Sequence, residues 1–391
     1  MKRIISAILA VAMAVTMLVI PANAAKSTVK VWNGKVVTSW YTGDKTEYNI
    51  SSPGQLAGLA KLVNSGESMQ GVVINLTADL KMNNTKDWKK WYETAPKNKF
   101  TPIGKTGDPI GGYYPFAGVF NGNGHSISGL YVNNPEVAGL FGYIYCAAVS
   151  NVIIKESVII AYDNEKNDGA YAGSIAGIAE GSIINKCENT GEVRCIGQKD
   201  AECGWRTAYA GGIVGSMHTE NVSSVALGVF MAAGGVFANP YIFTDGSGGL
   251  IKDSCVANCI SGGLIYTMSG VEAYSGGIAG WGNNGTIMNC LATNSFKWNK
   301  GRGGLGNLKL GGIAGGRYSC SVDNCYYYAE KKFYAVGEDT SSSVVPVKGK
   351  AYFCTKEQIR SKELAEKLGT AFKYVKDNRP YLTCDLRIAN K

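Results

Sequence analysis

The sequence predicts an all-β fold, a right-handed parallel β-helix (β-solenoid) of about five or more coils with short helical caps at both ends. A glycine-rich segment recurs with a phase of about 35 residues, and a cysteine follows it at a fixed distance in three repeats. The 391 residues include 51 glycines and 22 tyrosines, and only 18% are charged. Because recurrent glycine disfavours helices, strands and turns are expected through most of the chain.

Five segments share the repeated pattern of small, apolar and glycine residues. They are Val137–Gly142, Ala172–Gly177, Ala210–Gly215, Ser275–Gly280 and Leu310–Gly315. Their last glycines fall at 142, 177, 215, 280 and 315, so the spacings are 35, 38, 65 and 35. The spacing of 65 is close to two periods, which predicts a degenerate or interrupted repeat between Ser216 and Tyr274.

The repeat has a physical basis in stacked coils. Equivalent side chains of successive coils form ladders with a spacing of about 4.8 Å, because no coil can bury its apolar face alone. The repeat glycines are expected to supply corners with positive φ and to let backbones approach closely. The isoleucines of the last four segments should form one inward ladder. They are Ile175, Ile213, Ile278 and Ile313.

A second landmark lies ten residues after the last repeat glycine, where Cys187, Cys290 and Cys325 occupy one phase. An asparagine precedes the cysteine at Asn289 and Asn324, and Asn151 holds the same place. Asparagine tolerates a left-handed corner, and cysteine can serve as a small buried hydrophobe. The three phased thiols are expected to be buried and mostly free, with bridging between coils as the alternative. The other cysteines would then supply any disulfides: Cys195, Cys203, Cys255, Cys259, Cys320, Cys354 and Cys384.

These residues resemble a known repeat family. The segment Gly139-Leu140-Phe141-Gly142 is similar to the signature of the GLUG repeat, and the other four segments look like variants of it. The resemblance covers roughly residues 50–330, and 216–274 departs from the pattern. GLUG repeats occur in bacterial surface proteins, including regions beside the protease domain of streptococcal immunoglobulin A1 peptidases. The resemblance implies extracellular display and no particular reaction.

The N-terminus predicts export. Lys2 and Arg3 precede an apolar run, and Ala22-Asn23-Ala24 has the small-x-small pattern of a cleavage site. Residues 1–24 are therefore predicted to be a signal peptide, since the run is short for a membrane anchor. We expect the mature chain to be extracellular, secreted or associated with the cell surface, with no transmembrane span. The partner that would anchor it is not evident from the sequence.

The flanks of the repeats predict caps. In 25–82, a helix should begin after Ser52 with Pro53 in its first turn, and a strand should follow over 71–80. The repeats occupy 83–330. In 331–391, a helix starting near Thr355 should end at Gly369, followed by a short strand over 372–382.

Composition argues against several classes of protein. The formal net charge of +9 is spread along the chain, so no nucleic-acid partner is expected. The basic stretch Lys86–Lys99 contains Trp88, Trp91 and Tyr92 and is interpreted as a solvated loop, with phosphate or sugar binding as the alternative. No metal site and no cofactor are predicted, since only His125 and His218 are available beside the cysteines.

Motifs for catalysis are not evident. The sequence contains neither His-Glu-x-x-His nor Gly-x-Ser-x-Gly, and its two histidines are expected in a turn and a polar loop. No catalytic residue is predicted, and a binding protein fits better than an enzyme. The alternative is a polysaccharide lyase or glycosidase, whose carboxylates would be drawn from acids isolated in sequence, such as Asp245, Asp253 and Asp323.

Aromatic residues are the best candidates for binding. Flat rings on a rigid solenoid can pack against sugars or apolar groups of a host surface protein. The alternative is that about half of them fill the edges of the coils. The candidate binding residues are Tyr113, Tyr114, Trp205, Trp281 and Trp298.

Overall fold

The computed structural model describes most of the chain from residue 29 onwards. The described residues are 29–107, 112–163, 169–197, 207–218, 220–222, 242–244, 250–252, 254–269, 272–300, 307–330, 332–340 and 351–385. The predicted signal peptide, Trp205 and Cys203 lie outside these ranges. No helix in the described part is long and apolar enough to cross a membrane.

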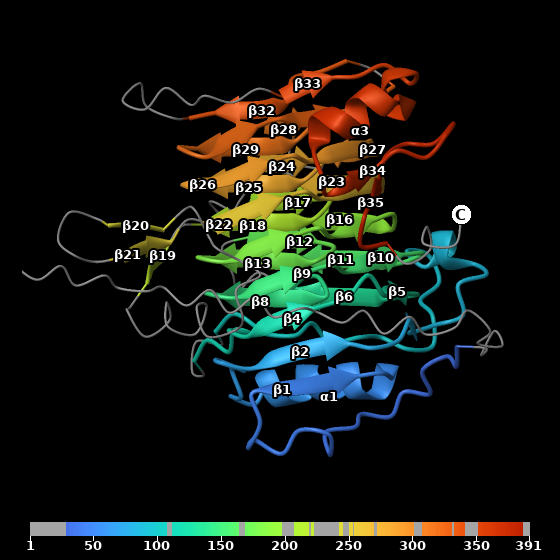
Figure 1. Ribbon diagram of the computed structural model, residues 1–391, viewed down its shortest axis with the longest axis vertical. Helices are drawn as coiled ribbons and strands as arrows, with labels where there is room; N and C mark the ends of the chain where they lie inside the picture. The colour runs from blue at the N-terminus through green and yellow to red at the C-terminus, as the bar shows by residue number, and fades with distance from the viewer. Residues whose placement is uncertain are drawn as a thin grey trace, which may run out of the picture.

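The protein is mostly β, and most of its strands belong to four parallel sheets that share one core. Successive repeats each add one strand to three of these sheets and one or two strands to the eleven-stranded sheet, so the strands stack along the long axis from β1 to β33 (Figure 1). We call one such set of strands a rung. The prediction of an all-β chain with parallel sheets is confirmed.

Two of the sheets carry the N-terminal strands as well as the repeats. The eight-stranded sheet contains β1 (Glu47–Ile50), β2 (Val73–Leu76), β4 (Val119–Asn121), β9 (Ala148–Ser150), β14 (Ile183–Asn185), β22 (Ser254–Ala257), β26 (Gly285–Met288) and β30 (Ser321–Asp323). The eleven-stranded sheet contains β3 (Leu80–Lys81), β5 (Ser126–Ser128), β6 (Tyr131–Pro135), β10 (Ile153–Lys155), β11 (Val158–Tyr162), β15 (Glu188–Asn189), β16 (Glu192–Ile196), β23 (Ile260–Ser269), β27 (Leu291–Lys300), β31 (Cys325–Tyr327) and β33 (Ala351–Phe353).

The other two parallel sheets are joined by the repeated glycine-rich segments. The five-stranded sheet contains β7 (Val137–Ala138), β12 (Gly169–Gly173), β17 (Thr207–Gly211), β24 (Glu272–Gly276) and β28 (Asn307–Gly311). The six-stranded sheet contains β8 (Phe141–Tyr145), β13 (Ala176–Glu180), β18 (Val214–His218), β25 (Ala279–Asn283), β29 (Ala314–Tyr318) and β32 (Val336–Asp339).

The predicted isoleucine ladder is confirmed. The backbone N–H of Ile175 donates to the carbonyl of Ile213, that of Ile213 to Ile278, and that of Ile278 to Ile313, over 2.8–3.0 Å. All four side chains are fully buried, and Leu140 continues the ladder on the rung below.

The glycines of the repeat act by close approach and not by positive φ, so that part of the prediction is wrong. None of the glycines in the five segments has positive φ. At Gly211, a Cβ atom would lie 1.8 Å from the carbonyl oxygen of Val214, and at Gly276 it would lie 1.9 Å from that of Ala279. Any side chain here would collide with backbone, so the turn between the two sheets requires glycine.

The spacing of 65 is not two periods. Strand β17 pairs directly with β24, and β18 pairs directly with β25, so no rung lies between them. The extra residues enter between β18 and β22, where β19 (Glu220–Val222), β20 (Ile242–Thr244) and β21 (Leu250–Lys252) form an antiparallel sheet. This sheet lies at the side of the stack (Figure 1). The segment is therefore one period plus an insertion.

Asparagines form the left-handed corner that the sequence predicts. Asn151, Asn258, Asn289 and Asn324 all have φ between 45° and 55°. Their amides also bond from rung to rung, because Asn324 Nδ2 donates to Asn289 Oδ1 over 2.8 Å and Asn289 Nδ2 to Asn258 Oδ1 over 3.3 Å. Lys186 holds the same corner on its rung with φ 51°, although lysine tolerates this conformation poorly.

The cysteine ladder is confirmed and is longer than predicted. Cys187, Cys290 and Cys325 are fully buried free thiols, and Cys259 occupies the same column between the first two. Assigning Cys259 to the group that forms disulfides was therefore wrong, because the insertion hid its phase. Cys195, Cys354 and Cys384 are also free thiols.

The N-terminal helix α1 (Pro53–Val63) begins as predicted. The side chain of Ser52 accepts the N–H of Gln55, and Leu56, Leu59 and Val63 are fully buried. The helix lies at the N-terminal end of the stack beside β1 (Figure 1). The strands β1 and β2 extend the same sheet as the repeats.

The C-terminal segment packs along the side of the stack. It contains η2 (Gln358–Arg360), α3 (Lys362–Leu368), β34 (Phe372–Lys373) and β35 (Tyr381–Leu382). Its apolar residues cover a column of outward side chains, Ile260, Leu291 and Tyr326, that spans three rungs. Arg379 also reaches down to the buried carboxylate of Glu188 over 2.5 Å. The segment thus supports several rungs laterally, as Figure 1 shows.

The basic aromatic strip is a loop whose lysines are exposed, as expected, but its tryptophans anchor it to the stack. Around η1 (Trp88–Lys90), Trp91 is buried with its ring 6.1 Å from that of Tyr131. The guanidinium of Arg194 lies 3.8 Å from the ring centre of Tyr92. The strip covers outward side chains of the eleven-stranded sheet.

The asparagine corner should be measurable in stability. Replacing Asn289 with Ala should lower the free energy of unfolding by about 1–3 kcal/mol, through left-handed strain and two lost amide bonds. Replacing Lys186 with Asn should raise it by about 0.5–1 kcal/mol, since only strain changes. Urea denaturation of both variants tests this prediction. An equal loss of unfolding free energy in the two variants would contradict the left-handed asparagine corner.

The buried thiols should resist modification in the native protein. Burial raises the pKa of the Cys259, Cys290 and Cys325 thiols well above the ordinary value, so thiolate should stay scarce even at pH 9. Mass-spectrometric mapping should therefore find Cys384 labelled before any cysteine of the ladder. Replacing Cys290 with Ser should cost about 1–3 kcal/mol in unfolding free energy. Rapid native labelling of the ladder would show that the stack is wrong.

Candidate functional site

An ordered set of aromatic rings runs along the outside of the five-stranded sheet. Tyr171, Tyr209 and Tyr274 occupy the same position on β12, β17 and β24. Their ring centres are 4.9 and 5.4 Å apart, and the rings are parallel within 8°. This is the strand spacing of a parallel sheet, so the in-register pairing itself stacks the rings.

Trp281 completes this set from the neighbouring sheet. Its ring meets that of Tyr274 edge-on at 4.8 Å and that of Tyr209 at 6.4 Å. On its own column it pairs with Ser216 below and Gly316 above. A Cβ atom at Gly316 would lie 2.5 Å from the indole, so small neighbours are what make room for the tryptophan. We call Tyr171, Tyr209, Tyr274 and Trp281 the aromatic column.

Charged residues fix the upper end of the aromatic column. The hydroxyl of Tyr274 donates to Glu338 over 2.7 Å, and Lys309 pairs with the same carboxylate over 2.8 Å. Burial, together with the bond to Glu338, raises the pKa of Tyr274 well above its ordinary value. The hydroxyl therefore stays a proton donor at any physiological pH.

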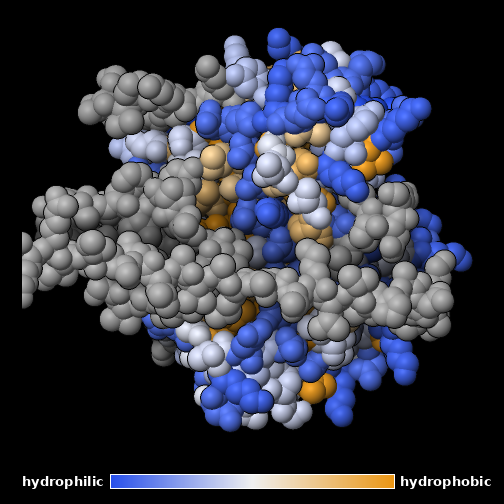
Figure 2. Space-filling view, in the orientation of Figure 1, coloured by the Kyte–Doolittle hydropathy of each residue, from blue (hydrophilic) through white to orange (hydrophobic). Residues whose placement is uncertain are grey.

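Tyr113 and Tyr114 lie near the N-terminal end of the same two sheets. Tyr113 is 71% exposed, and its ring is 6.2 Å from that of Tyr143 on β8. Tyr114 is half-buried under the ammonium of Lys105. Figure 2 shows one face of the molecule, where apolar side chains reach the surface in small patches between hydrophilic ones.

Trp298 lies apart from the aromatic column, in a cavity of about 400 Å³ at the C-terminal end. Its strand β27 continues to Lys300, whereas β31 above pairs only with Leu291 and Ala292. Phe296 and Trp298 lie one rung above Ile265 and Thr267, which are both buried. They are accessible because no described strand covers the second half of β27.

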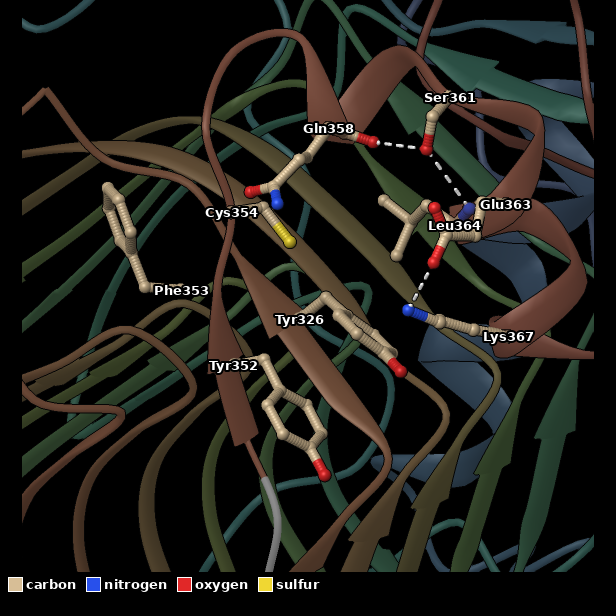
Figure 3. Close-up of a pocket in the computed structure, with 9 residues that line it drawn as sticks. All are labelled: Tyr326, Tyr352, Phe353, Cys354, Gln358, Ser361, Glu363, Leu364 and Lys367. Atoms are coloured by element: carbon tan, nitrogen blue, oxygen red, sulfur yellow. Dashed lines mark hydrogen bonds and ion pairs between the residues drawn. The ribbon is translucent and has the colours of Figure 1, made fainter.

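A second cavity, of about 370 Å³, lies between the last strands and the C-terminal helix (Figure 3). The rings of Tyr326 and Tyr352 stack at 5.3 Å on one side of it, and the Glu363–Lys367 pair lies on the other. Burial raises the pKa of the Cys354 thiol to about 11, so this thiol is protonated near neutral pH and is a poor nucleophile.

One pair of side chains has the residue types of a hydrolase. Ser216 Oγ lies 2.8 Å from His218 Nε2, on β18 and not in the loop that was expected. Burial lowers the pKa of His218, which would leave its ring neutral and able to accept a proton. Ser216, however, has no exposed surface, so a substrate cannot reach its hydroxyl in this conformation.

Of the acids considered for a lyase, the structure describes Asp323. Asp245 and Asp253 lie outside the described residues, and Asp323 is exposed on β30. Within the described ranges, no three His, Cys, Asp or Glu side chains are placed to hold a metal ion.

The sequence prediction found Trp281 but missed its three tyrosine partners. Each tyrosine stands two residues before the first glycine of its repeat segment, as Tyr171-Ala172-Gly173 illustrates. This periodic signal was available in the sequence. Trp298 was also predicted, but the unpaired end of β27 that exposes it was not.

Comparisons with known proteins give little beyond this geometry. No protein-family model matches the chain, and no curated protein matches its sequence. A solved structure described as a putative immunoglobulin A1 protease from Bacteroides ovatus superposes with a TM-score of 0.47 at 18% identity, over 86% of this chain and 92% of that one. A similarity of this size carries no argument about function. The resemblance to GLUG repeats stays a prediction.

The packing of Trp281 can be tested at Gly316. Replacing Gly316 with Ala should lower the unfolding free energy by about 1–3 kcal/mol and alter the near-ultraviolet circular dichroism, because the new methyl group collides with the indole. Gly112→Ala is the control, since a Cβ there meets nothing within 4 Å. Adding Trp281→Leu should remove part of the cost, since the methyl group would still lie 2.6 Å from the ring of Tyr274. Additive losses in the double variant would contradict the contact.

Proposed function

We propose that the protein is an extracellular glycan-binding protein, built as a right-handed parallel β-helix, whose ligand lies along the aromatic column. The observation that carries the proposal is the in-register stack of Tyr171, Tyr209 and Tyr274 flanked by Trp281. The apolar start of the chain supports export, and the resemblance to GLUG repeats supports display at a bacterial surface. Right-handedness follows the strong general preference of parallel crossovers.

The stacking decides how a ligand would be held. The faces of the tyrosines lie against one another, and Tyr274 is buried with its hydroxyl on Glu338, so the ring edges of Tyr171 and Tyr209 and the flank of Trp281 remain for contact. Tyrosine and tryptophan offer large amphipathic contact area at low entropy cost, and here their rotamers are already fixed by the stack. A line of such groups along the stack suits a linear polymer better than a small isolated molecule.

A second function, hydrolysis, has one observation in its favour, the Ser216–His218 contact. An active serine hydrolase would react with a fluorophosphonate probe at Ser216, which the burial of this residue opposes. A lyase would instead release unsaturated sugars that absorb in the ultraviolet. Either activity would replace the binding proposal with an enzyme.

Binding itself is tested on an array of bacterial and host glycans. The wild-type protein should be retained without changing the ligand, and Trp281→Ala should weaken retention about tenfold or more, as for a central aromatic contact. Tyr374→Ala, an exposed tyrosine of the C-terminal segment, is the matched control and should bind normally. The proposal would be contradicted if Trp281→Ala were retained as strongly as the wild-type protein, or if the protein bound only a host protein.

A further inference from the structure

The cavity at Trp298 contains an unsatisfied polar atom. Asn294 on β27 lines this cavity and is only 3% exposed. Its Nδ2 donates to Ser261 Oγ over 3.0 Å and to the carbonyl oxygen of Gly262 over 3.1 Å. Its Oδ1 is buried and accepts no hydrogen bond from any residue that the structure describes.

The orientation of this amide is fixed. The carbonyl of Gly262 can only accept, so the NH₂ group must face it and Oδ1 must face away. A buried acceptor without a donor is destabilising. This oxygen has almost no exposed surface, so a ligand O–H or N–H group reaches it after a small shift of the cavity wall and then satisfies it.

The rest of the lining is aromatic and apolar. Trp298 is 53% exposed, and Phe296 lies beside it with its ring 5.4 Å from that of Phe333 at an angle of 88°. Tyr328 and Leu310 complete the apolar walls. A partner must therefore combine a flat apolar face with hydroxyl or amide donors at its edge.

The charges around the cavity restrict the chemical class of the ligand further. The described lining contains the carboxylate of Glu330 at an exposed position, and it contains no lysine or arginine. Two acceptors, Glu330 and Asn294 Oδ1, repel an anion and favour donors. An acidic sugar is therefore disfavoured, whereas a neutral pyranose offers both a C–H face and several O–H donors.

We infer that this cavity is a second saccharide site, which takes one neutral pyranose ring with its apolar face on Trp298 and a hydroxyl or amide donor on Asn294 Oδ1. A cavity of about 400 Å³ is within the range of small-ligand sites, roughly 300–1,000 Å³. The site lies at the end of the stack, uses none of the residues of the aromatic column and does not rest on the proposal made for it.

The competing occupant is an extended peptide, because the second half of β27 is an edge without a described partner strand. A peptide would bond to the β27 backbone and would have little use for an acceptor on one buried side chain. The unsatisfied amide favours the saccharide, and the experiment separates the two.

The test is titration calorimetry of the full mature chain with glucose, galactose, mannose, N-acetylglucosamine and glucuronate as probes. At least one neutral sugar should bind, with quenching of tryptophan fluorescence, and glucuronate should bind at least tenfold more weakly. Trp298→Ala should weaken the binding of the neutral sugar tenfold or more. Tyr334→Ala, 81% exposed at the same end and outside the cavity, is the control and should bind normally.

A second variant keeps the result independent of folding. Ser295 is an exposed residue of the cavity rim, so Ser295→Trp should block the site while leaving the thermal midpoint unchanged. The inference would be overturned if no neutral sugar bound, or if Trp298→Ala and Ser295→Trp bound the sugar as tightly as the wild-type protein. Trp281→Ala should bind these monosaccharides normally, so failure here and failure of the aromatic column are distinguishable.

Discussion

In-register parallel pairing is the constraint on which the rest of the structure depends. Once Gly211 pairs with Gly276, every residue on either side acquires an equivalent neighbour about 4.8 Å away along the stack. The same register produces a ladder of isoleucines in the core, a ladder of thiols, a ladder of asparagine amides at a corner and a stack of tyrosines outside. Each ladder adds a little stability only because the others hold the same phase.

Segments outside the repeats cover one end and one side of the stack. A helix covers the N-terminal end, and the C-terminal segment crosses the side of three rungs. At the C-terminal end β31 is short, so Phe296 and Trp298 reach the surface. The columns that hold the buried Ile265 and Thr267 one rung lower thus form a candidate ligand site where the covering strand ends.

The period of the repeats could be predicted from the sequence, because the repeat glycines and Cys187, Cys290 and Cys325 recur with that period. The phase of Ile213 and Ile278 gave the inner ladder correctly. The insertion could not be recognised, since its length happens to approach one further period, and Cys259 was misassigned for that reason. Close approach at the repeat glycines was predicted correctly, whereas the positive φ predicted with it was wrong, because the conformation of the turn depends on three-dimensional neighbours. The cavity at Trp298 depends on where a strand stops pairing, which no local pattern shows.

The most direct test of the central claim is a cross-link across the insertion, between Tyr209→Cys and Tyr274→Cys. If the two strands pair in register, the Cα atoms lie within the range of about 4.4–6.8 Å that a disulfide spans, and mild oxidation of the native protein should bridge them. Tyr171→Cys with Lys309→Cys, three rungs apart, should remain unbridged. If the insertion added a rung, the first pair would be about 10 Å apart and would fail to cross-link, which would contradict the account.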